Sequence, residues 1–195
     1  METATHTIRF MTELGADVPA VDSAQMREVD RIAVEETGPN LYQMMENAGR
    51  NLALLAIQLL GEGWERAKVL VLAGSGGNGG GGICAARQLA NRNLTVAVCL
   101  AEPATLRGVP EFQRKILQST SAKEIPLDQI KNQQPDLVLD ALIGYGEAAP
   151  KGQVAELIAS TAPCRAPALA PDVPSGVAAN ERADSRSTRQ HRDGR

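Results

Sequence analysis

The sequence predicts one α/β domain built around a mostly parallel sheet, and three observations support this class. Residues 69–87 begin as a short apolar run, break into a glycine-dense loop and resume as an alanine-rich segment. This is the pattern of a buried parallel strand that turns tightly into a helix. Further apolar runs follow at 95–100 and 135–143, separated by segments of helical type. A length of 195 residues with 43% hydrophobic content suits one domain with a sizeable core.

Two helices are predicted ahead of the first strand. Asp22, followed three residues later by Gln25, is typical of a capping box and opens a helix over about 23–37. A second helix is expected over about 41–60, ended by Gly61. Its apolar stripe consists of residues spaced by three and four: Met45, Ala48, Leu52, Leu55 and Leu59. We expect these helices to cover the sheet or to pair with a second subunit, and the methionines at 44 and 45 to fill the core.

Strands and helices alternate in the rest of the chain. The glycine loop leads into a helix that ends near Asn91, and 95–100 is predicted as the second buried strand. A helix near 108–119 and a short strand at 123–125 follow. An apolar strand then runs from Pro135 to Asp140 and a second glycine turn. A helix over about 150–161 precedes an extended segment at 168–176.

Composition and charge narrow the function classes. The formal net charge is −3 and only 3% of the residues are aromatic, whereas nucleic-acid binders carry basic faces and stacking aromatics. No apolar run approaches the length that spans a bilayer. The first residues lack both a signal-peptide core and the appearance of a transit peptide. We therefore expect a cytoplasmic protein without nucleic-acid or membrane partners.

The histidines and cysteines limit the chemistry. His6 and His191 lie near opposite ends of the chain, in segments expected to be poorly ordered. This placement argues against histidine-based triads and zinc sites, and it leaves proton transfer to carboxylates, Lys, Tyr or water. The cysteines, at 84, 99 and 164, have no metal-type spacing. We expect them to be packing residues in a reducing compartment.

Three turns carry the candidate functional groups. The loop at 74–82 frees backbone amides at a helix start, where phosphate groups bind, although a tight turn without a ligand has the same pattern. Asp140 stands near the carboxyl end of its strand, where open parallel sheets bind ligands, although aspartate also caps helices and occupies turns. Pro174 and Gly176 present Asp172 and Ser175 on a stiff extended segment. The three turns could open onto one crevice.

These motifs resemble the NAD(P)H-hydrate epimerases, the YjeF N-terminal domain family. The segment GSGGNGGGG at 74–82 corresponds to the family's GPGNNGGDG, DALIGYG at 140–146 to its DA(L/I)FGxG, and DVPSG at 172–176 to its DIPSG. MENAG at 45–49 resembles the family's MExAG. The resemblance covers about residues 22–178 and implies a Rossmann-like three-layer αβα sandwich with a mostly parallel sheet.

The resemblance also implies an activity and a site. The family epimerises the R and S forms of hydrated NADH and NADPH, called NAD(P)HX, in nicotinamide nucleotide repair. By resemblance, Asp172 is the catalytic residue, which contacts the substrate and exchanges a proton with the hydroxyl on the hydrated ring. One potassium ion per subunit is implied on Asn78, Asp140 and Ser175, whose oxygens suit a hard cation. The implied substrate-binding residues are Gly77, Asn78, Gly79, Gly80, Gly81, Gly144, Tyr145, Gly146, Glu147, Ala148, Ala149, Pro150 and Asp172.

The implied partners are a small-molecule dinucleotide substrate and a second enzyme. NAD(P)HX is a substrate rather than a cofactor, and the metabolic partner is an ATP- or ADP-dependent NAD(P)HX dehydratase. A homodimer is left open.

Two departures from the family pattern leave alternatives open. Gly81 replaces the aspartate of the loop, and the glycine run at 79–82 is expected to loosen the loop and delay the helix start. Residues 179–195 have the composition of a disordered tail where the family continues with further strands, which leaves a sheet edge beside Leu169 exposed. We therefore divide the chain into an extension at 1–21, the domain at 22–178 and the tail.

The alternatives are a non-catalytic dinucleotide-binding or scaffolding module and a shortened, unstable product. A dehydrogenase ranks lower, because Glu102 is the only candidate near the expected position of a ribose-binding acid.

Overall fold

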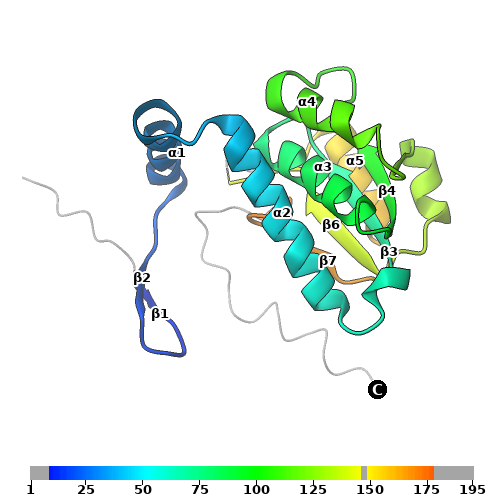
Figure 1. Cartoon of the computed structure of the whole chain (residues 1–195), viewed down its shortest axis with the longest axis horizontal. Coiled ribbons are helices and arrows are strands. Elements are labelled where there is room, and N and C mark those ends of the chain that lie inside the picture. The colour runs from blue at the N-terminus through cyan, green and yellow to red at the C-terminus, as the bar shows by residue number, and fades with distance from the viewer. Residues whose placement is uncertain (1–8, 146–148, 178–195) are drawn as a thin grey trace, which may run out of the picture.

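The computed structural model describes residues 9–145 and 149–177. Figure 1 shows the elements in chain order. The strands are β1 (Arg9–Met11), β2 (Asp17–Pro19), β3 (Lys68–Ala73), β4 (Thr95–Leu100), β5 (Lys123–Glu124), β6 (Leu137–Ala141) and β7 (Ala168–Leu169). The helices are α1 (Ser23–Ile32), α2 (Leu41–Leu60), α3 (Gly77–Ala90), α4 (Gly108–Leu117) and α5 (Gly152–Thr161). Short helical turns lie at Ala33–Thr37, Trp64–Arg66 and Leu127–Asn132.

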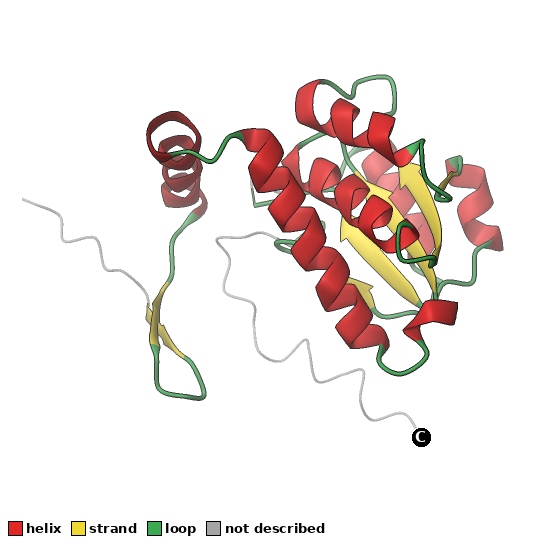
Figure 2. Cartoon of the chain, in the orientation of Figure 1, coloured by secondary structure: helices red, strands yellow, loops and turns green. Residues whose placement is uncertain are grey.

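The main sheet has the order β5-β4-β3-β6-β7, and every neighbouring pair is parallel. Helices cover both of its faces (Figure 2). On β3, Val69, Val71 and Ala73 belong to the core shared with α2 and α3. Leu70 and Leu72, which point the other way because side chains alternate along a strand, pack with α5 residues. The predicted three-layer αβα class is confirmed.

The glycine run starts α3 without delay, so the expected late helix start is wrong. The helix begins at Gly77, and residues 79–86 are all buried. The glycines allow α3 to approach its neighbours closely. A Cβ built on Gly82 would lie 2.4 Å from the Cβ of Ala141, and one on Gly79 would lie 1.7 Å from the carbonyl oxygen of Gly74. Close packing therefore holds in place a segment that helix propensity alone disfavours.

The predicted stripe on α2 is only partly correct. The bounds of the helix agree with the prediction, but its buried residues are Gly49, Leu52, Ala53 and Ala56. Leu55 and Leu59 are exposed. Small residues face α3 because the two helices cross closely: a Cβ on Gly49 would lie 2.4 Å from the Cβ of Cys84. The larger leucines therefore turn outward, although spacing alone placed them inside.

The N-terminal elements stand apart from the main body (Figure 1). β1 and β2 pair as an antiparallel hairpin within the predicted extension. The predicted capping box opens α1, since Asp22 accepts from the backbone of Gln25 and the Gln25 side chain accepts from the backbone of Asp22. None of the α1 residues is buried. Of the two leading helices, therefore, only α2 covers the sheet.

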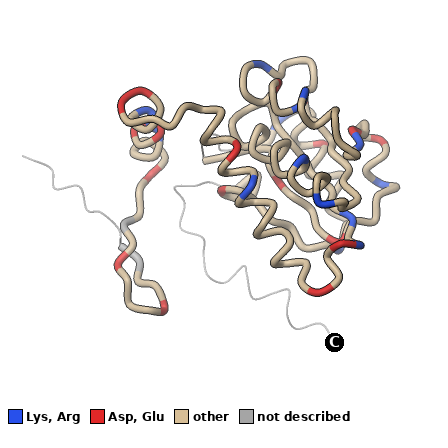
Figure 3. The backbone as a smooth tube through the Cα atoms, viewed as in Figure 1, with Lys and Arg blue, Asp and Glu red and all other residues tan. Residues whose placement is uncertain are grey.

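The α1 surface carries charges of both signs (Figure 3), with Arg31 bonded to Glu28, Glu35 and Glu36. Such exposed pairs add little stability. The structure describes no helix with the length and apolar character needed to cross a bilayer. His6, His191 and the predicted tail at 179–195 lie outside the described residues.

Candidate functional site

Three turns leave the sheet at the carboxyl ends of adjacent strands. The glycine loop follows β3, a second turn follows β6 after Asp140, and the segment with Asp172 and Ser175 follows β7. β6 pairs with β3 on one side and with β7 on the other. The three turns therefore meet at one edge of the sheet, the place where open parallel sheets bind ligands.

The backbone of Ile143 joins the three turns. Its N–H donates to Ser175 Oγ at 3.0 Å, and its carbonyl accepts from Asn78 Nδ2 at 3.0 Å. Ser175 in turn donates to both oxygens of Asp140, from Oγ at 2.6 Å and from its backbone N–H at 2.8 Å. Asn78, Asp140 and Ser175 thus form one hydrogen-bonded cluster around the backbone of Ile143, although they are far apart in the sequence.

Asp172 is exposed beside the second turn. The backbone N–H of Tyr145 donates to its Oδ2 at 2.8 Å, and no other hydrogen bond to this carboxylate is made by the part of the chain that the structure describes. Gly176 closes the turn with a φ of +93°, a conformation that favours glycine. Pro150 lies beside it, since a Cβ on Gly176 would be 3.2 Å from Pro150 Cγ. The carboxylate is therefore fixed in position while one oxygen stays available.

A cavity of about 520 Å³, here called the edge cavity, opens beside these turns. Its volume falls within the usual range for small-molecule sites. One wall is apolar and comes from α2. The first turn of α3 forms another wall, where backbone N–H groups that lack helical partners favour an anion. The edge cavity is lined by residues of seven segments: Asp30, Val34, Leu41, Met44, Met45, Ala48, Leu52, Gly74, Ser75, Gly76, Gly77, Asn78, Gly81, Ala101, Glu102, Leu142, Ile143, Gly144, Tyr145, Val154 and Pro171.

The predicted substrate-binding residues fall into three groups. Those that line the edge cavity are Gly77, Asn78, Gly81, Gly144 and Tyr145. Those that do not line it are Gly79, Gly80, Ala149, Pro150 and Asp172. Gly146, Glu147 and Ala148 lie outside the described residues. The buried Gly79 and Gly80 serve helix packing, and Asp172 adjoins the cavity wall through its neighbour Pro171 and through its hydrogen bond from Tyr145.

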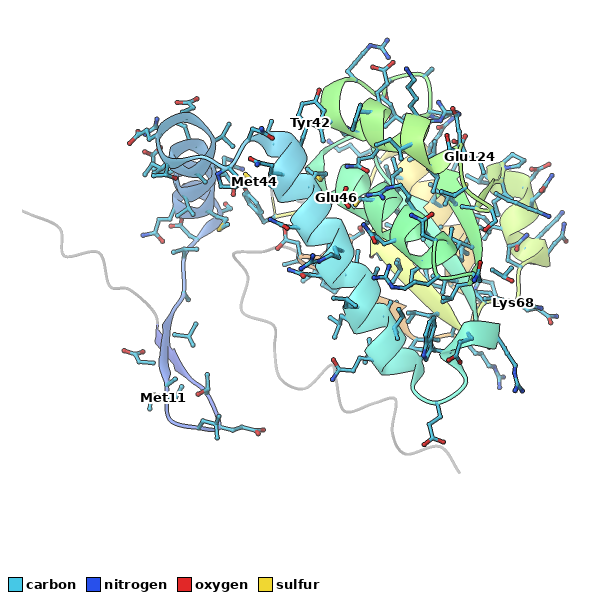
Figure 4. All side chains as sticks on the ribbon, in the orientation of Figure 1. Met11, Tyr42, Met44, Glu46, Lys68 and Glu124 are labelled. Carbon is cyan, nitrogen blue, oxygen red and sulfur yellow. The ribbon has the colours of Figure 1, made fainter. Side chains whose placement is uncertain are left out.

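Several lining residues were not anticipated from the sequence. Asp30 accepts a hydrogen bond of 2.5 Å from the hydroxyl of Tyr145, which lies 115 positions away. No local pattern could reveal this contact. Met44 and Met45 line the cavity wall instead of serving only as core filler. Figure 4 marks Met44 on α2, on the side of the helix that faces α1. The sequence placed Met45 in the apolar stripe of α2, but it did not indicate the cavity that both methionines line.

The phenol of Tyr145 links the site to Asp30 on α1, and its pKa is raised. Partial burial, together with the hydrogen bond to Asp30, raises the pKa of Tyr145 to about 12. The phenol therefore stays protonated and remains a donor throughout the physiological range. Because its pKa in the folded state lies above the ordinary value of about 10, the stabilisation is complete below pH 10 and is lost as pH rises toward 12.

Replacing Tyr145 by phenylalanine is expected to lower the free energy of unfolding by about 1 kcal/mol at pH 8, the usual contribution of one hydrogen bond. The difference in the free energy of unfolding between the variant and the wild type should shrink between pH 10 and pH 12. Denaturant unfolding at several pH values measures this difference. Tyr42→Phe is the matched control, because Tyr42 packs against Phe112 through its ring. A difference that is unchanged at high pH would contradict the assigned role of the phenol.

A polar cluster fastens α2 to α3 next to the cavity. Glu46, labelled on α2 in Figure 4, accepts from Arg87 Nη2 at 2.6 and 2.5 Å and from Gln88 Nε2 at 2.6 Å. Burial raises the pKa of Glu46, but the bonds to Arg87 outweigh that effect and leave it lowered. Burial raises the pKa of Cys84 and of Cys99 to about 11. These thiols are poor nucleophiles, and all of the cysteines are free, as expected of packing residues.

A comparison with protein-family models decides the family. Residues 41–188 match the model described as YjeF-related protein N-terminus. The chain belongs to the YjeF-related N-terminal family. The matched region contains all three turns and the cluster around Ile143. It confirms the resemblance inferred from the glycine loop, the Asp140 turn and the Asp172 turn.

Named relatives support the same family. The chain is 48% identical to the NAD(P)H-hydrate epimerase of Dehalogenimonas lykanthroporepellens, over 89% of this chain and 71% of that protein. It is 32% identical to the NAD(P)H-hydrate epimerase of Rhodopirellula baltica, over 82% of this chain and 66% of that protein. The bifunctional NAD(P)H-hydrate repair enzyme Nnr of Hyperthermus butylicus is 34% identical over 81% of this chain and 30% of its own length.

A solved structure agrees with the fold. The crystal structure of yeast ynu0 superposes with a TM-score of 0.69 at 23% identity, over 82% of this chain and 72% of that chain. At this identity the likeness concerns the fold alone. It supports the layered α/β architecture described above.

Proposed function

We propose that this chain is an NAD(P)H-hydrate epimerase, an isomerase that interconverts the R and S forms of hydrated NADH and NADPH. The observation that carries the proposal is the 48% identity, over 89% of the chain, to a relative named for that activity. The edge cavity supports it chemically, because it combines an anion-binding helix start, an apolar wall and a nearby carboxylate. The activity belongs to nicotinamide nucleotide repair.

In the proposed mechanism the chain's own residues bind, orient and move one proton. The backbone amides that open α3 at Gly77 and Asn78 hold the diphosphate. Met44, Met45 and Leu52 offer the apolar surface of α2 to a ring. Asp172, oriented by the N–H of Tyr145, takes the proton of the hydroxyl on the hydrated carbon as the bond from that carbon to the ring nitrogen opens and leaves an aldehyde. The nitrogen then adds to the opposite face of the aldehyde, and the proton returns to the oxygen. Positioning of this kind and proton transfer together suit a reaction that already proceeds slowly without a catalyst.

The cluster around Ile143 has the donor set for a potassium ion. Asn78 Oδ1, the Asp140 carboxylate and Ser175 Oγ are all oxygens, and hard cations favour oxygen ligands. In the described residues no group of three or more His, Cys, Asp or Glu gathers to suit a more highly charged metal. A bound K⁺ would supply positive charge close to the diphosphate. Asn78, Asp140 and Ser175 would hold the ion, and the same residues would keep the three turns in register.

Potassium is expected to raise the melting temperature of the substrate-free protein. At a concentration ten times its Kd, the ion would add about 1.4 kcal/mol, which is roughly 3 to 5 °C. The comparison is made against tetramethylammonium chloride at equal ionic strength. In Asp140→Asn and Ser175→Ala the potassium-dependent part of the shift should fall, whatever the absolute stability of each variant. Equal potassium-dependent shifts of the melting temperature in all three proteins would contradict the assignment of Asp140 and Ser175 as ligands.

Two partner proposals accompany the activity. The exposed Leu54, Leu55 and Leu59 on α2 favour a homodimer. A separate ATP- or ADP-dependent dehydratase would consume the S form. The name of the bifunctional Hyperthermus butylicus relative, a repair enzyme, supports an association between the two activities.

The deciding experiment is epimerisation of purified R-NADHX with potassium present, followed by chromatography of the two forms. We expect acceleration well above the spontaneous rate. A folded protein that binds ADP-ribose without accelerating the reaction would instead favour the binding module. Gly81, which removes the carboxylate of the family loop from the cavity wall, would then be the first difference to examine.

A further inference from the structure

Glu102 lies where the second strand of the sheet reaches the edge cavity. β4 ends at Leu100, and the N–H of Ala101 donates to the carbonyl of Ala73 at 2.9 Å. This bond carries the pairing with β3 up to the first glycine of the loop. Glu102 follows directly and lines the edge cavity together with the residues that open α3. A carboxylate therefore shares the edge cavity with the helix start that would hold a diphosphate.

The exposed Glu102 carboxylate has a hydroxyl neighbour on one oxygen and keeps the other available. The single proton of the Thr105 hydroxyl is shared between the Glu102 carbonyl, at 2.9 Å, and Glu102 Oε2, at 3.2 Å. The N–H of Thr105 also donates to that carbonyl, at 3.1 Å. Within the described ranges, no group hydrogen-bonds Oε1. A carboxylate oxygen left available in this way is an acceptor suited to hydroxyl groups.

The cations of the same region are engaged elsewhere. Arg107 donates from Nη1 to the carbonyls of Ala104 and Leu106, at 2.9 and 2.6 Å. Arg114 forms an ion pair with Glu124 at 2.8 Å. Among the described residues that line the edge cavity, the charged side chains are carboxylates, Asp30 and Glu102, with no Lys or Arg. The cavity therefore accepts hydroxyls and disfavours an additional phosphate.

We propose that Glu102 accepts hydrogen bonds from the adenosine ribose hydroxyls of the bound dinucleotide and makes the site selective for NADHX over NADPHX. The inference rests on the proposed function for the identity of the substrate. Its physical basis is general: a carboxylate at the end of the strand beside a glycine loop binds a free ribose 2′-hydroxyl and repels a 2′-phosphate. Both the attraction and the repulsion contribute to selectivity.

The test measures binding and turnover separately. Calorimetry with ADP-ribose and with 2′-phospho-ADP-ribose should give at least tenfold tighter binding of the former to the wild type, the range for one hydrogen bond to a charged group. The ratio of kcat/KM for R-NADHX over R-NADPHX should show the same preference. Glu102→Gln should narrow both ratios about tenfold, mainly through Kd and KM, with kcat for R-NADHX little changed.

The matched control is Glu65→Gln. It makes the same chemical change in an exposed residue just ahead of β3, at the opposite end of the strand. It should leave both ratios unaltered. A wild-type binding ratio near one, or a ratio that Glu102→Gln does not move, would overturn the role of Glu102. Selective binding without epimerisation would support Glu102 and contradict the proposed activity, so the two failures are distinguishable.

Discussion

Replacing Asp172 by asparagine is expected to lower the accelerated epimerisation of R-NADHX by 100-fold or more. General acid–base catalysis by one positioned side chain typically contributes 10²–10⁴-fold. The amide oxygen of asparagine can still accept the 2.8 Å hydrogen bond from the Tyr145 N–H. The substitution therefore removes the negative charge and the basic oxygen that takes up the proton, while the turn keeps its support. We expect kcat to fall and KM to change little, measured by chromatography of the two forms.

The matched control is Asp136→Asn, at the amino end of β6. Asp136 accepts from the backbone N–H of Lys68 at 2.8 Å, a bond that an amide oxygen can also make. Lys68, labelled in Figure 4, marks this opposite edge of the sheet. The control should keep the full rate. Unimpaired catalysis by Asp172→Asn would rule out the proposed proton transfer.

Substituting alanine for Gly79 is expected to cost about 3 kcal/mol or more, which is roughly 6 to 12 °C in Tm. A Cβ at this position would lie 1.7 Å from the carbonyl oxygen of Gly74, and the backbone would have to move to make room for it. The glycine loop and the first turn of α3 would then separate. The favourable helix propensity of alanine, about 1 kcal/mol, does not offset this clash.

Gly81→Ala is the matched comparison, because it makes the same change two residues along the same helix. The nearest atom to a Cβ there is Met45 Sδ at 3.8 Å, an ordinary van der Waals contact. Alanine should therefore stabilise the protein by about 0.5–1 kcal/mol. Calorimetric melting of both variants tests the pair. Similar Tm changes in both variants would show that helix propensity, and not close packing, determines the effect of alanine in the glycine run.

Much of the fold could be predicted because its signals are local. The capping box of Asp22 and Gln25, the apolar runs of β3, β4 and β6, and the glycine loop each depend on a few consecutive residues. They gave the strand sequence and most helix bounds. The convergence of Asp140 and Ser175 could be anticipated as well, since parallel strands bring their carboxyl ends to one edge.

The remaining features depend on contacts that no local pattern encodes. The burial of Ala53 in place of Leu55 follows from the close crossing of α2 and α3, and spacing at three and four does not distinguish these two faces. The bond from Tyr145 to Asp30 joins residues 115 positions apart. The early start of α3 is decided by the close approach of Gly79 and Gly82 to their neighbours, which overrides helix propensity.

The backbone of Ile143 makes the three turns one unit with respect to sequence change. A substitution in any turn that moves this residue by a few tenths of an ångström alters its hydrogen bonds to both Asn78 and Ser175. The effects of substitutions in different turns should therefore not add, as is usual for residues that share a partner. We expect substitutions at this edge to be tolerated only when residues of different turns change together, whereas exposed positions of α4 and α5 can change one at a time.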